Sequence, residues 1–101
     1  MKTDQYAIVR LQSDPTGVYI ALSYPGLETN GTIIIAPLVA ENMIAIVDTL
    51  HPVVDTPFGR KVIAVERLAA VLPDLVESSG HSLIAYDHLI HRALSRLFYG
   101  N

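Results

Sequence analysis

The four histidines are the side chains of this 101-residue chain best suited to acid–base catalysis or metal binding. His88 and His91 are three residues apart, so on a helix they would share a face, where Asp87 or His81 could complete a ligand set. The H-E-x-x-H pattern of helical zinc sites is absent, and there is no cysteine to form a zinc thiolate or a disulfide. His51 has no acid or base beside it in the sequence. We therefore expect a solvated helix face, with no metal and no other cofactor.

Motifs of nucleophilic or phosphate chemistry are also absent. Ser78, Ser79, Ser82 and Ser95 lie in no G-x-S-x-G elbow, and there is no G-x-G-x-x-G. The segment 56–61 resembles a phosphate loop superficially, but it lacks the glycine spacing that such a loop needs. Because the carboxylates are scattered along the chain, we expect a protein that is not an enzyme.

The end of the chain carries an unusual group of side chains, Leu97-Phe98-Tyr99-Gly100-Asn101. Neighbours on a helix point about 100° apart, so two consecutive aromatic rings cannot both face one core. If Phe98 packs inward beside Leu94, Tyr99 projects at the tip, where an exposed aromatic ring can anchor a partner. The alternative, in which Tyr99 folds back onto the sheet, stays open at this point.

The elements that must position this end begin with a helix. Its apolar stripe has the spacing i, i+3, i+4, i+7, i+8 and i+11, which predicts one amphipathic helix. Asp87 near its start, Arg92 and Arg96 near its end, and Gly100 after it suit the helix dipole and a C-terminal stop. The stripe consists of Tyr86, Leu89, Ile90, Ala93, Leu94 and Leu97.

Before the helix, the chain has the composition of short β-strands separated by turns. The continuous run 32–36 is typical of a strand buried on both faces, and we expect Pro37 to end it. Residues 40–50 suit a helix or a strand, with a short strand favoured, and 78–81 suit a loop before the helix. The predicted strands are 5–10, 18–22, 32–36, 52–54 and 60–65, with a further apolar stretch at 67–72 and turns at 13–17, 28–31 and 56–59.

The composition predicts one soluble, cytoplasmic domain spanning residues 1–101, without a membrane span or leader. With 7 basic and 10 acidic residues, the net charge of −3 argues against a protein that binds nucleic acid by itself. Half of the residues are apolar, which is more than a small domain easily buries in its core. We therefore expect part of the surplus to form an interface, most simply in a two-fold homodimer.

In the order of its motifs, the chain resembles the CcdB toxins of type II toxin–antitoxin modules. The resemblance spans the whole chain and is carried by three segments at near-identical spacing. Gly31 to Leu38 ends in Ile-Ala-Pro-Leu; 50–54 is Leu-His-Pro-Val-Val where the family has Leu-Tyr-Pro-Val-Val; and 97–100 is Leu-Phe-Tyr-Gly where the family has an apolar residue followed by Phe-Trp-Gly.

This resemblance implies a mainly β fold, an SH3-like small β-barrel with a C-terminal α-helix, in a homodimer. It also implies a topoisomerase poison of plasmid maintenance: a toxin that binds the A subunit of DNA gyrase and traps the cleaved DNA complex. A CcdA-like antitoxin would neutralise it, and the pair would repress transcription of its own operon. The toxin would therefore contact DNA only as part of the complex with its antitoxin. By position, Tyr99, Gly100 and Asn101 match the gyrase-binding tip. Tyr24, Gly26 and Leu27 are candidates for a second gyrase-binding loop.

The ending Tyr-Gly-Asn replaces Trp-Gly-Ile of the plasmid member, which predicts a weaker gyrase contact or one tuned to a different gyrase. Two alternatives remain. One is a degenerate toxin that acts only as an antitoxin-binding co-repressor. The other is a MazF-like endoribonuclease, against which the acidic balance and the sparse basic residues count.

Overall fold

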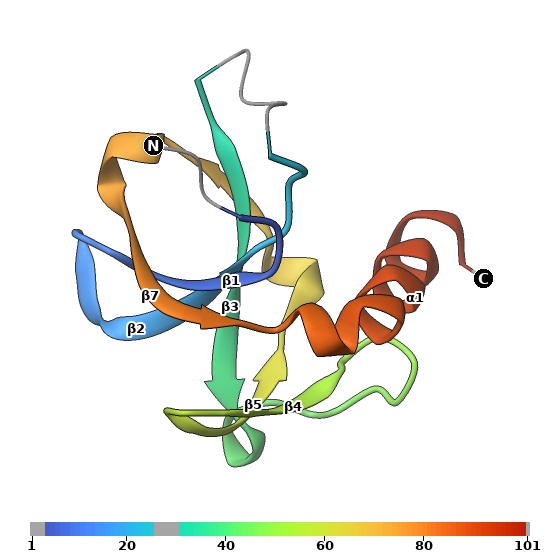
Figure 1. Ribbon diagram of the computed structural model, residues 1–101. Helices are drawn as coiled ribbons and strands as arrows, with labels where there is room; N and C mark the ends of the chain where they lie inside the picture. Colours follow the sequence, from blue (N-terminus) through green and yellow to red (C-terminus); the bar gives the residue numbers. More distant parts are fainter. Residues whose placement is uncertain (1–3, 26–30, 101) are drawn as a thin grey trace.

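The computed structural model describes residues 4–25 and 31–100 and has one strongly curled antiparallel sheet with a helix beside it (Figure 1). Within these residues the strand order is β4-β5-β3-β2-β1-β7, and β6 pairs with β3 beside β5. The elements are β1 (Ala7–Leu11), β2 (Asp14–Ala21), β3 (Ile33–Ala40), η2 (Glu41–Met43), β4 (Val53–Thr56), β5 (Gly59–Ile63), η3 (Val65–Arg67), β6 (Ala69–Val71), η4 (Pro73–Leu75), β7 (Val76–Ser82), η5 (Ile84–Tyr86) and α1 (Asp87–Tyr99). The expected small β-barrel with a C-terminal helix is confirmed.

Side chains rather than a strand ladder bridge the two ends of this strand order. Phe58, in the turn between β4 and β5, contacts His81 on β7 edge-to-face, with ring centroids 6.0 Å apart. The guanidinium carbon of Arg10 on β1 lies 4.8 Å from the centroid of the same ring. A cation over an aromatic face is attracted by the ring quadrupole, so Phe58 holds the β4–β5 hairpin against β1 and β7.

The core lies on both sides of the central strands, because alternate residues of a strand point to opposite faces. Ile8 and Ile20 belong to the larger cluster, which Ile90 and Ala93 of α1 complete. Val9 and Ile35 belong to a smaller cluster on the other face. This double burial explains why the β-branched run in β3 is continuous rather than alternating.

The prediction that Pro37 ends its strand is wrong, since β3 continues to Ala40. Pro37 pairs with Tyr19 of β2, and its carbonyl accepts a hydrogen bond of 3.0 Å from the Ala64 amide on the other side. The amide and carbonyl of one strand residue point to the same side. The missing N–H of Pro37 therefore falls where the partner of β3 changes from β6 to β5, and no ladder bond is lost.

Three other local predictions are also wrong. Ala40 is the last residue of β3, and residues 41–50 form no further strand; they contain η2 and then irregular chain up to β4. The predicted turn at 13–17 lies mostly within β2, which begins at Asp14. The predicted loop 78–81 lies within β7, where pairing with β1 overrides the turn-forming composition. The hairpin around 56–59 is confirmed, whereas the predicted turn at 28–31 lies mainly outside the described residues.

The predicted helix is confirmed, with Ile90 and Ala93 buried on its apolar stripe. Gly100 ends it in the left-handed region at φ 74°, and its amide donates to the carbonyl of Arg96 over 3.0 Å. This is the usual C-terminal cap of a helix, because glycine has no Cβ to oppose a positive φ. In the part of the chain that the structure describes, no helix combines the length and apolar character needed to cross a bilayer.

Candidate functional site

The C-terminal end of α1 carries two adjacent aromatic side chains that both face solvent. Phe98 is 63% exposed and Tyr99 is 78% exposed. Tyr99 therefore does not fold back onto the sheet, and Phe98 does not pack inward either. The helix stripe ends at Leu97, which packs partly against the core, so that Phe98 lies at the edge of the stripe.

The turn after these aromatic residues is held by one arginine. The Arg96 carbonyl accepts from the Gly100 amide, and the Arg96 guanidinium donates to the Gly100 carbonyl over 3.2 Å. Both backbone groups of Gly100 are thereby tied to the last helical turn. This clasp presents Tyr99 from an ordered helix end, which lowers the entropy lost when a partner binds it.

Beside Phe98 the surface has an apolar groove of about 300 Å³. Leu94 and Phe98 of α1 form one wall, while β3, the residue after η3 and the segment after β2 contribute the others. Its lining consists of Leu22, Ser23, Ile34, Leu68, Leu94 and Phe98. Since only Ser23 contributes a polar side chain, the groove suits an apolar group rather than a charged substrate.

The segment after β2 is fixed to this groove by hydrogen bonds. The Leu22 amide donates to the Ile34 carbonyl over 2.8 Å, and the Ser23 hydroxyl accepts from the Ile34 amide over 3.1 Å. The Gln5 side chain donates to the Leu22 carbonyl over 3.1 Å. Tyr24 follows immediately and is 62% exposed.

The two segments that carry the candidate contact residues therefore approach one groove. Ser23 precedes the loop candidate Tyr24, Phe98 precedes the tip candidate Tyr99, and Ser23 and Phe98 both line the groove. Figure 1 shows the chain after β2 on the side of the molecule where α1 ends. Of the other candidates, Gly26, Leu27 and Asn101 lie outside the described residues.

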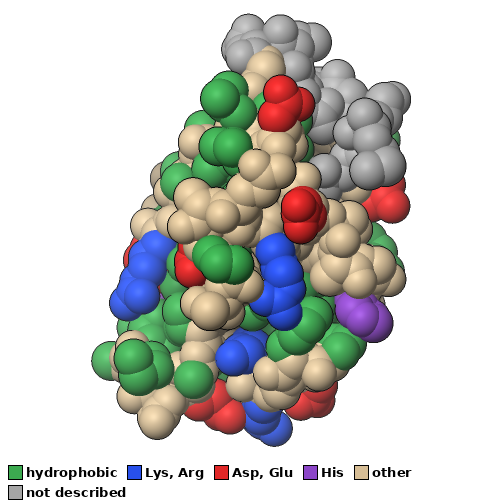
Figure 2. Space-filling model, turned by 90° about the vertical axis from the view of Figure 1, so that its left-hand side faces the viewer, with side chains coloured by type: hydrophobic (Ala, Val, Ile, Leu, Met, Phe, Trp, Pro, Cys, Tyr) green, Lys and Arg blue, Asp and Glu red, His purple; other side chains and the backbone are tan. Residues whose placement is uncertain are grey.

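The histidines first considered as metal ligands do not gather. His88 and His91 are exposed on α1, and His81 contacts Phe58. Within residues 4–25 and 31–100, no three histidine or acidic side chains are placed to share a metal ion. On the face drawn in Figure 2, Lys and Arg side chains are interspersed with Asp and Glu and form no continuous basic surface.

The sequence does not indicate the partner of His51. The ring is buried, with 3% of the residue exposed, and its Nε2 lies 2.6 Å from the Glu66 carboxylate of η3. Fifteen residues separate the two, so no local spacing indicates the pair; only the apolar neighbours Leu50 and Pro52 hint at burial of His51.

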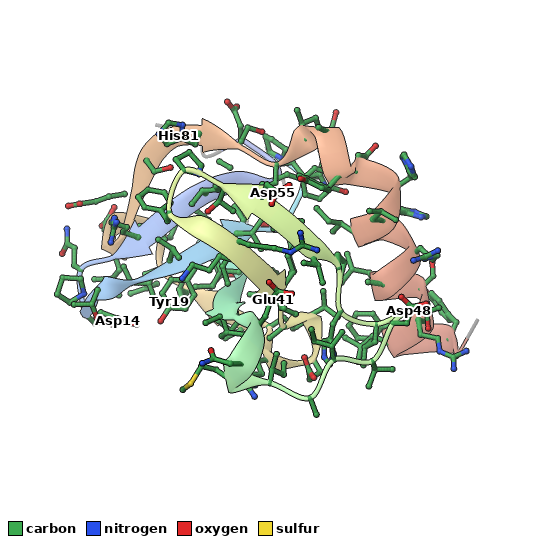
Figure 3. All side chains as sticks on the ribbon, turned by 90° about the horizontal axis from the view of Figure 1, so that it is seen from below. Asp14, Tyr19, Glu41, Asp48, Asp55 and His81 are labelled. Atoms are coloured by element: carbon green, nitrogen blue, oxygen red, sulfur yellow. The ribbon has the colours of Figure 1, made fainter. Side chains whose placement is uncertain are left out.

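Tyr6 and Tyr19 have raised pKa values. Burial, together with a hydrogen bond to Asp87, raises the pKa of Tyr6 to about 12. A hydrogen bond to the Asp14 carboxylate, together with burial, raises the pKa of Tyr19 to about 12 (Figure 3). Both shifts favour the neutral phenol. Neither tyrosine lines the groove, so these groups bear on stability rather than on the candidate site.

A scan against protein-family models finds no match to this chain, and a search of the curated proteins finds none.

Proposed function

We propose that this protein is a CcdB-type toxin that binds the A subunit of DNA gyrase and traps its cleaved complex with DNA. The observation that carries the proposal is the pair of exposed aromatic side chains, Phe98 and Tyr99, on a helix end clasped by Arg96. The segmental resemblance of the chain to CcdB toxins supplies the target.

The proposed mechanism needs no catalytic side chain. A ligand that binds one state of an enzyme better than the others shifts the population toward that state. Binding the cleaved state about 10⁴-fold better would move it from a 1:99 minority to a 99:1 majority. Tyr99 supplies a ring that can stack on an arginine of gyrase, worth about 0.5 to 2 kcal/mol per contact.

The proposal includes a two-fold homodimer, because the gyrase target is itself two-fold and two helix ends would meet it symmetrically. Exposed apolar side chains on the monomer support an interface: Met43 is 71% exposed and Leu72 is 58% exposed. We further propose a cytoplasmic protein neutralised by a CcdA-like antitoxin, with which it represses its own operon.

A gyrase cleavage assay tests the proposal. Purified protein is incubated with gyrase of the organism that carries the gene, ATP and supercoiled plasmid, and the reaction is quenched with detergent. We expect linear DNA with the wild type and at least tenfold less with Tyr99→Ala. Ile84→Ala is the matched control, since it truncates another exposed apolar side chain, in η5 at the opposite end of α1 from Tyr99.

The other outcomes identify the alternatives. If a folded dimer yields no linear DNA but binds its antitoxin, the protein is a co-repressor without poisoning activity. If it cleaves RNA in the absence of gyrase, and Arg60→Ala or Arg67→Ala abolishes cleavage, it is an endoribonuclease. Linear DNA that is unchanged by Tyr99→Ala would remove Tyr99 from the contact.

A further inference from the structure

His51 is a buried titratable side chain for which the proposed function has no use. It lies at the end of residues 44–50, here called the 44–50 loop, which follows η2 and precedes β4. The loop carries exposed apolar side chains: Ile46 is 42% exposed and Val47 is 50% exposed. The contacts that fix the conformation of this loop therefore determine the positions of these exposed side chains.

The hydrogen bonds of His51 determine its tautomer. The Val47 amide donates to Nδ1 over 2.9 Å, and a backbone N–H can only donate, so Nδ1 carries no proton. The proton of the neutral ring is therefore on Nε2, which donates to Glu66 over 2.6 Å. One ring thus joins the 44–50 loop to η3 through two atoms with opposite roles.

Val47 is the loop residue whose backbone groups make the most hydrogen bonds to the turn before His51. Its carbonyl accepts from the amides of Leu50 and His51, over 2.9 and 2.8 Å. Its amide goes to the His51 ring, so both backbone groups of Val47 depend on the turn that ends at His51. Beyond this turn, the Pro52 carbonyl accepts from Ile63 over 2.9 Å, which fixes the other side of His51 to the sheet.

The far end of the segment is anchored separately. Glu41 of η2, labelled in Figure 3, pairs with Arg60 of β5 over 3.2 Å, and both side chains are exposed to solvent. An exposed pair of this kind contributes about 0 to 1 kcal/mol. The buried His51 contacts are therefore the stronger hold on the 44–50 loop.

Protonation would act on the two ring nitrogens differently. A charged ring still donates from Nε2 to Glu66, and the opposite charge of Glu66 favours that contact. At Nδ1, the new N–H would point at the Val47 N–H, and two donors cannot share a hydrogen bond. Protonation therefore breaks the hydrogen bond between Val47 and Nδ1, whereas the contact between Nε2 and Glu66 remains.

An ionisable side chain of η3 contacts the ring. Glu66, from η3, is the ionisable group in hydrogen-bonding distance among the described residues. Asp48 is the nearest charged residue along the loop itself, and Arg67 follows Glu66 in η3. Helix α1, which packs against η3, buries the apolar residues Ile90 and Ala93.

We infer that His51, as the neutral Nε2–H tautomer, is a pH-sensitive lock on the 44–50 loop: protonation of Nδ1 releases Val47 while Glu66 keeps the ring on η3. This inference rests on the geometry of His51 alone and is independent of the proposed function.

The test is an NMR titration of the intact protein labelled with ¹⁵N. At neutral pH, long-range ring correlations should show a proton on Nε2 and none on Nδ1. On acidification, the Val47 amide should shift with the same midpoint as the His51 ring. Its protection factor, the exchange rate of an unstructured amide at the same pH divided by its own, should fall about tenfold, as the loss of one hydrogen bond predicts. Amides of β1 and β2 should not change at that midpoint.

Two variants separate the roles of the ring atoms. His51→Asn keeps an acceptor near the position of Nδ1, and His51→Gln keeps a donor near that of Nε2. We expect the Val47 amide to be protected at all pH values in His51→Asn and unprotected at all of them in His51→Gln. In Glu66→Gln the acid response of Val47 should persist, because it arises at Nδ1.

A proton on Nδ1 at neutral pH would overturn the inference, as would a ring that titrates while the Val47 amide stays unchanged. Loss of the Val47 response in a folded Glu66→Gln would also overturn it. If the His51 variants fail to fold, the wild-type titration decides alone, since it needs no substitution.

Discussion

The Tyr86 hydroxyl accepts a hydrogen bond of 3.0 Å from the Asp55 amide, 31 residues earlier in the chain. Asp55 lies on β4, at one end of the strand order, and Tyr86 lies in η5, which follows β7 at the other end. The bond therefore ties the open edge of β4 to the start of α1. It acts with the contact between Phe58 and His81 to close the curled sheet.

Removing this bond should weaken the closure without emptying the core. Tyr86→Phe keeps the ring but leaves the Asp55 amide without its partner, so we expect a loss of about 1 kcal/mol in the free energy of unfolding. Urea denaturation followed by circular dichroism measures it. Ile90→Ala, which leaves a cavity at a fully buried position, should lower the free energy of unfolding by about 2 to 5 kcal/mol. It serves as the comparison for a loss of core packing. Equal losses would contradict the peripheral role of the Tyr86 bond.

The hydrogen bond between Asp14 and Tyr19 requires a residue without a side chain at position 17, which is Gly17. A Cβ at Gly17 would lie 2.2 Å from the Asp14 Oδ2 and 3.1 Å from the Tyr19 ring. We expect Gly17→Ala to displace the Asp14 carboxylate from the Tyr19 hydroxyl and to cost about 1.5 to 3 kcal/mol, the range for hydrogen bonds to charged groups. A double-mutant cycle checks the cause: in an Asp14→Ala background, Gly17→Ala should cost under half as much. An undiminished cost in that background would place the clash elsewhere.

The raised pKa values of Tyr6 and Tyr19 predict loss of stability at alkaline pH. Each phenol ionises at about 12 in the folded protein, against about 10 when unfolded, so the fold favours the protonated form. This stabilisation is complete below pH 10 and falls as the pH rises from 10 to about 12. Raising a pKa from about 10 to about 12 contributes at most roughly 2 to 3 kcal/mol per tyrosine to the free energy of unfolding.

Unfolding free energies measured by urea denaturation between pH 8 and 12 test this dependence. Tyr19→Phe should remove about half of the slope above pH 10, and the double variant with Tyr6→Phe most of it. A slope that survives both substitutions would have to come from other groups.

The helix cap supports a prediction about the candidate site. Gly100→Ala places a Cβ at φ 74°, where L-residues are disfavoured by about 1 to 2 kcal/mol. We expect a small loss of global stability, because the cap lies at the chain end, but faster amide exchange in the last helical turn and weaker binding through Tyr99. Gly100→Asn, which tolerates this conformation better, should recover part of the binding. Binding unaffected by Gly100→Ala would show that the clasp by Arg96 is not needed.

Features encoded by near neighbours in the chain could be predicted from the sequence. The stripe from Tyr86 to Leu97 has helical spacing, and Gly100 follows it as a stop, so both the helix and its cap were predictable. The hairpin around Thr56 to Gly59 was predictable for the same reason, since turn chemistry acts over four residues. The exposed aromatic end was half predicted: geometry requires one ring to face outward, and the structure shows both outside.

What only the tertiary structure decided depends on partners distant in sequence. Pro37 remains within β3 because the partner strand changes beside it, and residues 78–81 form a strand because β1 supplies the ladder. The pairing of His51 with Glu66 and the meeting of Ser23 and Phe98 at one groove arise in the same way. Periodicity and turn chemistry report local conformation, whereas burial and hydrogen-bond partners follow from which segments the folded sheet brings together.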